Sequence, residues 1–350
     1  MDKQIANIVE SVADKIPIFS TIKIHEYEIP WLVNFSQMYT FMKNLGMGGL
    51  GSVKAYIENQ TSSVYAIKEI ALIGNEDSNF YKTLLSEVDI LKDLTVNNYS
   101  RSILKYHDAF MHVNPDGSRY FMIITEYIEG FSLDKIFNDN IQLLTHVILP
   151  IGYWLFETLA FMHNLGYVHR DIKPHNIMLD TMNERFVLID FGLTCSVNKN
   201  NQKLLCSNGK FHGTVSYMPP EAFIEPDKPS KYDRIKSMDN IKMIGLSRLK
   251  FNDVHDVSPR LEQLKAIDIW AAGITLYVLI ENKLPWDDKF DYMIRDKIVG
   301  SYEIPYNKSK SIKYILDMCL IRDPSKRSDA EHIRKLIANV IADWRSLSNY

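Results

Sequence analysis

The spacing of the apolar residues changes near Tyr127, and this change constrains the fold more than any other feature of the chain. Between Tyr39 and Tyr127, short strand-like runs alternate with glycines and polar turns, and a helical pattern interrupts them at about 79–94. After Tyr127, apolar residues recur at helical spacing over 145–165, 266–283, 311–321 and 329–347. The pattern predicts an α+β protein with a small β-rich N-lobe, a larger helical C-lobe and a cleft between them.

Composition excludes several classes of protein. Hydrophobic residues make up 46% of the chain and charged residues 24%, and the formal net charge of −3 gives no reason to expect binding to nucleic acid. No apolar run approaches the roughly 18–20 residues of a membrane span, and the first residues do not resemble a signal peptide. We therefore expect an intracellular, most simply cytoplasmic, protein, in a host cell if a virus or pathogen delivers it.

The three cysteines are Cys195, Cys206 and Cys319. Their odd number and the absence of metal-ligand spacing fit a reducing environment. Cys195 and Cys206 are nevertheless close enough in sequence to be considered as a pair.

Two segments lie outside the main pattern. Residues 1–38 form an N-terminal extension, with a predicted helix at 3–15 and a β-rich stretch over 18–29 that Pro30 should end. Residues 225–265 are polar and irregular, which predicts an insertion in the C-lobe. Its spaced apolar residues are consistent either with a short helix that docks a partner or with a solvated loop.

A glycine-rich segment, Gly46 to Val53, contains the pattern G-x-G-x-x-G at Gly46, Gly48 and Gly51. Glycines let backbone N–H groups approach phosphate oxygens closely, although such a pattern alone is weak evidence. A dinucleotide-binding motif needs a helix directly after the glycines, whereas here another strand-like run follows. The segment therefore predicts a hairpin folded over a ligand.

Lys68 ends the apolar run Val64-Tyr65-Ala66-Ile67. A lysine at a strand end is usually solvated, and it gains a functional meaning only with a carboxylate as partner. Glu87, on the helix predicted at about 79–94, is the candidate for that partner.

The most specific segment runs from His169 to Asn176 and fixes six residue types in the pattern H-R-D-x-K-P-x-N. Asp190-Phe191-Gly192 follows it. In such a set, Asp171 orients an attacking hydroxyl and Lys173 offsets charge on a phosphoryl group. Asn176 and Asp190 supply oxygen ligands for Mg²⁺.

Together these elements resemble the eukaryotic protein kinase family, in family order and over roughly Tyr39 to Trp344. The resemblance implies the bilobal protein kinase fold, with an N-lobe at 39–127 and a C-lobe at 128–344. Further landmarks also resemble the family, namely Gly213-Thr214 and Met218-Pro219-Pro220-Glu221 at the end of an activation segment, Asp268-Ile269-Trp270 at the start of a central helix, and Arg327 as the partner of Glu221.

The resemblance implies specific roles. Lys68 would contact the α- and β-phosphates of ATP and pair with Glu87, Asp171 would be the catalytic base, and Lys173 would face the γ-phosphate. Asn176 and Asp190 would bind Mg²⁺, with Mn²⁺ as a substitute.

Thr125 would be the gatekeeper, Glu126 and Ile128 would offer backbone groups to adenine, and Val53, Ala66 and Met178 would enclose the ring. Lys173 and Thr214 imply a protein substrate with a serine or threonine acceptor.

The chain departs from the family pattern at four places, namely Leu50 at the loop tip, Pro219, Lys210, and the long gap between Glu221 and Asp268. Lys210 matters most, because many family members carry an activating phosphosite at that position. In the resembling family, the arginine at the position of Arg170 usually binds this phosphate. Either Ser207 is the acceptor, or the segment is active without modification and Arg170 has another partner. Glu184 and Asp180 are acidic but lie close to the catalytic loop.

Two alternative functions use related folds. A pseudokinase or scaffold protein should have lost Lys68, Asp171, Asn176 or Asp190, and all four are present. A small-molecule kinase should lack the segment from Gly213 to Glu221, which is also present. The sequence therefore favours an active serine/threonine protein kinase.

Overall fold

The chain divides into two units, and each is described by itself. Unit 1 comprises residues 1–97 and 104–128, and unit 2 comprises residues 98–103 and 129–350. The computed structural model describes residues 19–24, 27–32, 35–48, 51–73, 78–97, 101–139, 141, 143–197, 204–206, 213–223, 258–286, 288, 290–300, 303–305 and 310–347. The helix predicted at 3–15, the departures at Leu50 and Lys210, the candidate acceptor Ser207 and most of the polar insertion lie outside these residues.

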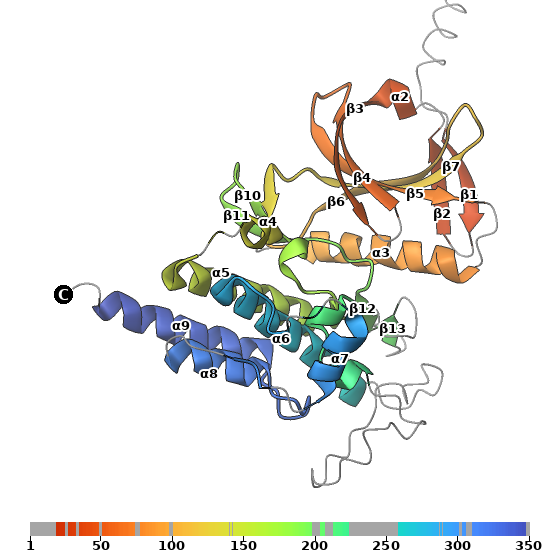
Figure 1. Cartoon of the computed structure of the whole chain (residues 1–350). Helices are drawn as coiled ribbons and strands as arrows, with labels where there is room; N and C mark the ends of the chain where they lie inside the picture. The colour runs from red at the N-terminus through yellow and green to blue at the C-terminus, as the bar shows by residue number, and fades with distance from the viewer. Residues whose placement is uncertain are drawn as a thin grey trace, which may run out of the picture. The chain divides into compact units, whose positions relative to one another are not determined.

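Unit 1 is built on a seven-stranded sheet in the order β1-β2-β6-β7-β5-β4-β3 (Figure 1). Its strands are β1 (Phe19–Ile24), β2 (Tyr27–Leu32), β3 (Tyr39–Gly48), β4 (Gly51–Glu58), β5 (Val64–Leu72), β6 (Tyr106–Val113) and β7 (Arg119–Glu126). All neighbours pair antiparallel except β2 and β6. The hairpin of β6 and β7 turns at Asn114–Gly117, where the N–H of Gly117 donates to the carbonyl of Asn114 at 2.9 Å and Gly117 takes a left-handed φ of +85°.

The strands β1 and β2 form a hairpin that extends this sheet beyond β6. The prediction that Pro30 ends the β-rich stretch was wrong, because Pro30 lies inside β2 opposite Thr21. The parallel pairing of β2 with β6 involves only Trp31 and Leu32. The N–H that proline lacks is therefore not needed for that ladder.

The sheet of unit 1 is covered on both faces. Helix α3 (Ser78–Asn97) lies along one face (Figure 1), which confirms the predicted helix, and it buries Leu84, Leu85, Val88, Ile90, Leu91 and Leu94. On the other face, the short helix α2 (Phe35–Met38) inserts Phe35 among Tyr39, Tyr56 and Phe110. The face that carries Lys68 is thus separated from this aromatic cluster by the sheet itself.

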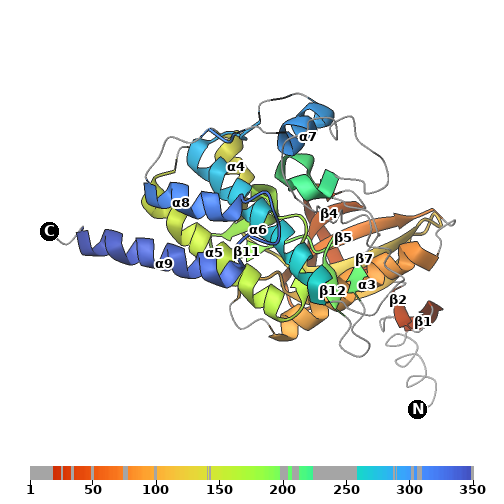
Figure 2. The ribbon, with the colours of Figure 1, turned by 90° about the horizontal axis from the view of Figure 1, so that it is seen from below.

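Unit 2 is mainly helical. Its helices are α4 (Asp134–Asn138), α5 (Thr145–Asn164), α6 (Ser258–Glu281), α7 (Asp291–Val299), α8 (Lys310–Cys319) and α9 (Ala330–Leu347). Figures 1 and 2 show α5, α6, α8 and α9 packed side by side. The helices predicted at 145–165, 311–321 and 329–347 are confirmed. Asp329 caps α9, because its Oδ1 accepts the N–H of His332 at 2.7 Å.

Helix α6 is the core of unit 2. The prediction that it begins near Asp268 was wrong, because it begins at Ser258, and its first turns carry polar residues such as Glu262 and Lys265 that hide the helical pattern. The stretch Leu261–Glu281 is long and apolar enough to cross a membrane, but 89% of its most apolar window is buried inside the protein. Such burial is that of a core helix.

Two small sheets in unit 2 frame the segments of greatest chemical interest. One has the order β11-β10-β8, with β8 (Gly130–Ser132), β10 (Ile177–Asp180) and β11 (Arg185–Leu188). The other has the order β13-β12-β9, with β9 (Tyr167–Val168), β12 (Cys195–Val197) and β13 (Leu204–Cys206). The segment from His169 to Asn176 therefore runs between β9 and β10, and Asp190 lies between β11 and β12.

Candidate active site

The glycine-rich segment forms the predicted hairpin. Gly46 pairs with Val53 and Gly48 with Gly51, between β3 and β4. At Gly51 a side chain has no room, because a Cβ atom there would lie 2.1 Å from the backbone oxygen of Glu69. Gly51 is thus required by the close approach of β4 and β5, whereas a Cβ at Gly46 would meet nothing within 4 Å.

The register of three strands places four of the predicted residues on one face of the sheet. Val53 lies opposite Lys68, and Ala66 lies between β4 and β7 opposite both Ala55 and Thr125. Side chains alternate between faces along a strand, and directly paired residues share a face. Val53, Ala66, Lys68 and Thr125 therefore point to the same side.

Lys68 and Glu87 form the predicted ion pair. The ammonium Nζ of Lys68 lies 2.7 Å from Oε1 and 2.9 Å from Oε2 of Glu87. Glu87 is buried, with 5% of its side chain exposed, whereas 18% of the Lys68 side chain is exposed. The carboxylate therefore fixes the ammonium on the face of the sheet that also carries Val53 and Ala66.

The predicted adenine-contacting residues are divided between the units. Thr125 is buried and its hydroxyl donates to the carbonyl of Ala66 at 3.3 Å. The N–H of Glu126 donates to the carbonyl of Lys105 at 2.9 Å, so that N–H is already engaged. Ile128 is the last residue of unit 1, and Met178 lies half-buried in β10 of unit 2. The enclosure of adenine by residues of both units stays a prediction.

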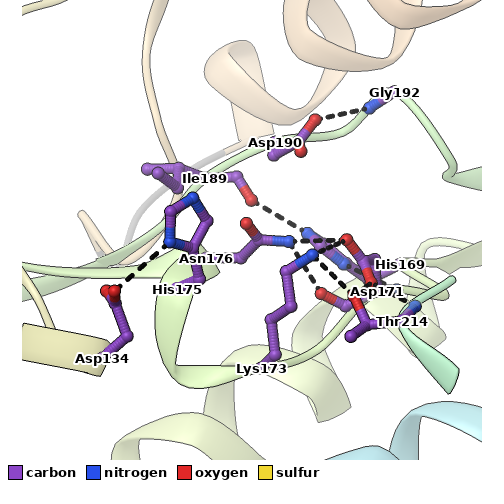
Figure 3. A network of polar contacts seen from close by, with 10 residues as sticks. All are labelled: Asp134, His169, Asp171, Lys173, His175, Asn176, Ile189, Asp190, Gly192 and Thr214. Carbon is purple, nitrogen blue, oxygen red and sulfur yellow. Dashed lines mark hydrogen bonds and ion pairs between the residues drawn. The ribbon is translucent and has the colours of Figure 1, made fainter. Parts of the chain in front are cut away.

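In unit 2, the carboxylate of Asp171 is the centre of a polar network (Figure 3). Its Oδ2 accepts from Lys173 Nζ at 2.7 Å and from Asn176 Nδ2 at 3.0 Å. Its Oδ1 accepts from the N–H and from the hydroxyl of Thr214, both at 3.2 Å. Lys173 also donates to the Thr214 hydroxyl at 2.8 Å, so Thr214 contacts both Asp171 and Lys173.

The charge state of Asp171 follows from these contacts. Burial alone would raise the pKa of Asp171, but the nearby ammonium of Lys173 and its hydrogen bond outweigh burial, with further help from His169 and Thr214. The pKa of Asp171 is therefore lowered, and the side chain is a carboxylate at neutral pH. It can accept a proton without first losing one.

The imidazole of His169 holds the backbone of this segment. Its Nδ1 accepts the N–H of Asp171 at 3.3 Å, and its Nε2 lies 3.1 Å from the carbonyl of Ile189. Because an N–H only donates and a carbonyl only accepts, these partners assign the ring proton to Nε2. His169 thereby links the residue before Asp190 to Asp171.

Asn176 and Asp190 suit a metal ion bound together with a nucleotide. Asn176 Nδ2 donates to the backbone oxygen of Asp171 at 2.8 Å, and Figure 3 shows its amide oxygen turned toward the side on which Asp190 lies. Among the described residues, no group of three or more His, Cys, Asp or Glu side chains could hold a metal by itself. Mg²⁺ is often held by one or two protein oxygens together with phosphates and water, so this pair fits the ion.

Glu221 and Arg327 form a buried, bidentate ion pair. Nη1 and Nη2 of Arg327 lie 2.8 Å and 3.2 Å from the two carboxylate oxygens of Glu221, and the Arg327 side chain has no exposed surface. Arg327 also donates to the carbonyls of Ala266 and Ile321, and its guanidinium stacks over Trp270. The predicted pairing is confirmed.

Arg170 is buried beside Cys195. Its Nη1 lies 3.0 Å from Sγ of Cys195, and Cys195 is disulfide-bonded. Burial lowers the pKa of Arg170 to about 10, although the carboxylate of Asp268 opposes this shift. Asp180, one acidic residue considered for Arg170, is instead bound to Arg185 and Asn183.

Comparison with known proteins decides the family. A family model described as the protein kinase domain matches residues 39–238, which is more than half of the chain. The chain belongs to the protein kinase family. Its β-rich unit 1 and helical unit 2 agree with the bilobal kinase fold, and membership of this family implies the use of ATP and of a protein substrate.

Several curated kinases are similar over most of this kinase chain. They include a serine/threonine-protein kinase of Dictyostelium discoideum (26% identical over 84% of the chain), a MAP kinase kinase kinase of Saccharomyces cerevisiae (26% over 85%) and a serine/threonine-protein kinase of Kluyveromyces lactis (27% over 84%). The matched part spans 52%, 18% and 25% of these relatives. The chain therefore spans only about half or less of the length of these relatives.

Three contributors to this kinase site were not predicted in their observed roles. Asp268 accepts the backbone N–H groups of His169 and Arg170, His163 binds the same carboxylate, and Cys195 contacts Arg170. Asp268 was identified from the sequence only as a helix landmark. The position of Cys195 shortly after Asp190-Phe191-Gly192 was the one signal that pointed toward a role for this cysteine.

Proposed function

We propose that the chain is an ATP-dependent serine/threonine protein kinase that transfers the γ-phosphate of ATP to serine or threonine hydroxyls of protein substrates. The observation that carries the proposal is the carboxylate of Asp171, held between Lys173, Asn176 and Thr214. A scaffold protein has no need for an ionised carboxylate in such a setting. The names of the similar kinases support the serine/threonine preference.

The proposed reaction uses the contacts of Asp171 directly. The substrate hydroxyl oxygen forms a bond to the γ-phosphorus while the bond from that phosphorus to the β,γ-bridging oxygen breaks, which releases ADP. Asp171 orients the hydroxyl and accepts its proton, and Lys173 lies close enough to Asp171 to offset negative charge on the transferred group. Thr214, which belongs to the activation segment, forms hydrogen bonds with both Asp171 and Lys173.

Nucleotide and metal binding are assigned to the remaining residues. Lys68, fixed by Glu87, is proposed to bind the α- and β-phosphates, while the glycine hairpin lets the backbone approach them. Asn176 and Asp190 would hold Mg²⁺, or Mn²⁺ in its place, and the bound ion would neutralise phosphate charge. We expect activity to vanish on chelation and to return with either ion.

The test is transfer of labelled phosphate from γ-labelled ATP to casein, followed by identification of the labelled amino acid. We expect phosphoserine and phosphothreonine, and no transfer with Asp190→Ala. Asp171→Asn should lower kcat by orders of magnitude while leaving ATP affinity nearly unchanged, because the base acts on the hydroxyl.

Asp317→Asn is the matched control, because Asp317 is an exposed carboxylate that forms a surface ion pair with Lys313 one turn earlier on α8. It should keep wild-type transfer. ATP binding without transfer by the wild-type chain would instead indicate the scaffold function. Transfer to tyrosine would contradict the roles given to Lys173 and Thr214.

A further inference from the structure

Strand β12 connects the segment after Asp190 to two neighbours at once. It pairs antiparallel with β9, so that Cys195 lies opposite Val168, the residue before His169. On its other side it pairs with β13. This small sheet is therefore one of the places where the activation segment contacts the segment that leads into His169–Asn176.

The two cysteines of this sheet stand directly opposite each other. Cys195 of β12 is paired with Cys206 of β13. Opposed residues in an antiparallel ladder have Cα atoms about 4.5–5.5 Å apart, within the range of about 4.4–6.8 Å that a disulfide spans. Cys195 is disulfide-bonded, Cys319 is a free thiol, and the chain has 3 cysteines. Within one chain, elimination therefore leaves Cys206 as the cysteine that can pair with Cys195.

The cross-link reaches the catalytic loop through Arg170. Sγ of Cys195 lies 3.0 Å from Nη1 of this buried arginine. The backbone of Arg170 is bound in turn by Asp268 at 2.7 Å, and Arg170 directly precedes the proposed base, Asp171. Sulfur, guanidinium and catalytic loop thus form one continuous set of contacts.

We propose that Cys195 and Cys206 are a redox modification site whose disulfide holds the activation segment against Arg170, in the place where other kinases use a phosphate. The oxidant is a small-molecule disulfide such as oxidised glutathione. One cysteine thiolate attacks this disulfide and releases one molecule of reduced glutathione, leaving a mixed disulfide on the protein. The second thiolate then displaces the other glutathione, so that two thiols lose two protons and two electrons to form the bond.

The bond is activating, because the cross-linked structure contains the working arrangement of the site. In the same structure, Thr214 contacts Asp171 and Lys173 from the far end of the activation segment. Without the bond, β12 and β13 are joined by only three residue pairs, and such short strands are marginal by themselves. Reduction should therefore release the segment and lower the fraction of molecules with Thr214 in place.

The chemical part of the proposal is tested without any assay of activity. The full chain is incubated in glutathione buffers of different oxidised-to-reduced ratio, its free thiols are alkylated, and its peptides are analysed by mass spectrometry. We expect a peptide pair that joins Cys195 to Cys206, and alkylation of Cys319 alone after denaturation. Hydrogen exchange of the Cys195–Val197 amides should be slower in the oxidised protein. Absence of that peptide pair, or equal exchange in both states, would overturn the proposal.

The activity part rests on the proposed kinase function. Reduction should lower kcat/KM for casein on the order of tenfold, as expected if most molecules lose the ordered segment. Cys206→Ser should have this low activity in every buffer, whereas Cys319→Ala, which keeps the cross-linked pair, should respond to glutathione like the wild type. Equal activity of the oxidised and reduced enzyme, or a gain on reduction, would disprove an activating bond. Loss of all transfer in every state, with the exchange difference preserved, would count against the kinase function and leave the cross-link standing.

Discussion

Asp268 Oδ1 accepts the backbone N–H of Arg170 at 2.7 Å, across 98 residues of sequence. Its other oxygen accepts the N–H of His169 at 2.8 Å and contacts the ring of His163 at 3.0 Å. Arg170 has a φ of +71°, a left-handed conformation that is unfavourable for a side-chain-bearing residue. The buried carboxylate of α6 therefore holds a strained backbone directly before Asp171.

Asp268→Asn should reduce both stability and turnover. An amide has one oxygen in place of two, so at least one buried N–H would face an NH₂ group and lose its acceptor. We expect a loss of about 1–3 kcal/mol in the free energy of unfolding, measured in urea, and a fall in kcat larger than the change in KM for ATP. Asp317→Asn, which changes an exposed carboxylate of α8, should alter neither quantity. An unchanged unfolding curve for Asp268→Asn would mean that these bonds do not hold the catalytic loop.

The lowered pKa of Asp171 sets the response of the site to acid. A carboxyl whose folded pKa is below its ordinary value stays ionised above that value, and its contribution to stability is lost as pH falls through the folded pKa. Protonation of Asp171 should therefore not reduce kcat between about pH 5 and pH 7. Lys173→Met removes the charge that opposes burial, so a carbon NMR titration should find the pKa of Asp171 raised in this variant. A pKa that stayed low would assign the shift to the remaining neighbours of Asp171, namely His169 and Thr214.

The parts of the site that the sequence predicted share one property, which is that their chemistry is local. The glycine hairpin follows from residue spacing within β3 and β4. The octet from His169 to Asn176 places the proposed base, the lysine beside it and a proposed metal ligand within eight consecutive residues. The pairing of Lys68 with Glu87 needed only one strand and the next helix. These contacts can be predicted from sequence spacing because they form within one element or between neighbouring elements of the chain.

The parts that escaped prediction depend on tertiary contacts. Nothing in the segment around Asp268 indicates that its carboxylate binds two N–H groups from another element. The start of α6 at Ser258 was missed because the outer turns of a helix that enters the core need no apolar stripe. The contact of Arg170 with Cys195 requires β12 to pair with β9, and strand pairs of two residues leave no periodic signal.

Gly51 and Gly46 offer a matched pair in the glycine hairpin. Gly51→Ala would place a Cβ 2.1 Å from the carbonyl oxygen of Glu69, so β4 and β5 must separate, and overpacking of this kind costs about 1–3 kcal/mol. Gly46→Ala meets nothing within 4 Å and should keep the melting temperature. We expect Gly51→Ala to lower the melting temperature and to raise KM for ATP. Equal melting temperatures for both variants would show that the sheet yields freely at Gly51.

The ion pair of Glu221 with Arg327 should be the most costly of these interactions to break. Both side chains are buried, and Arg327→Ala would leave the Glu221 carboxylate without its partner, at a cost of roughly 3–5 kcal/mol. The variant should therefore melt well below the wild type. Glu221 lies at the end of the activation segment, eight residues after Gly213. Because Arg327 anchors this end of the segment, the Arg327→Ala variant should also lose activity.

A second variant separates the loss of a partner from the loss of the pair itself. Glu221→Leu combined with Arg327→Met replaces both charges by apolar groups, so no unpaired charge remains, and the double variant should be less destabilised than the sum of the two single changes. Lys313→Ala breaks an exposed pair on α8 and should change the melting temperature little. If Arg327→Ala melted like the wild type, the buried pair would contribute no more than an ordinary surface contact, and the activation segment would have to be anchored by other residues.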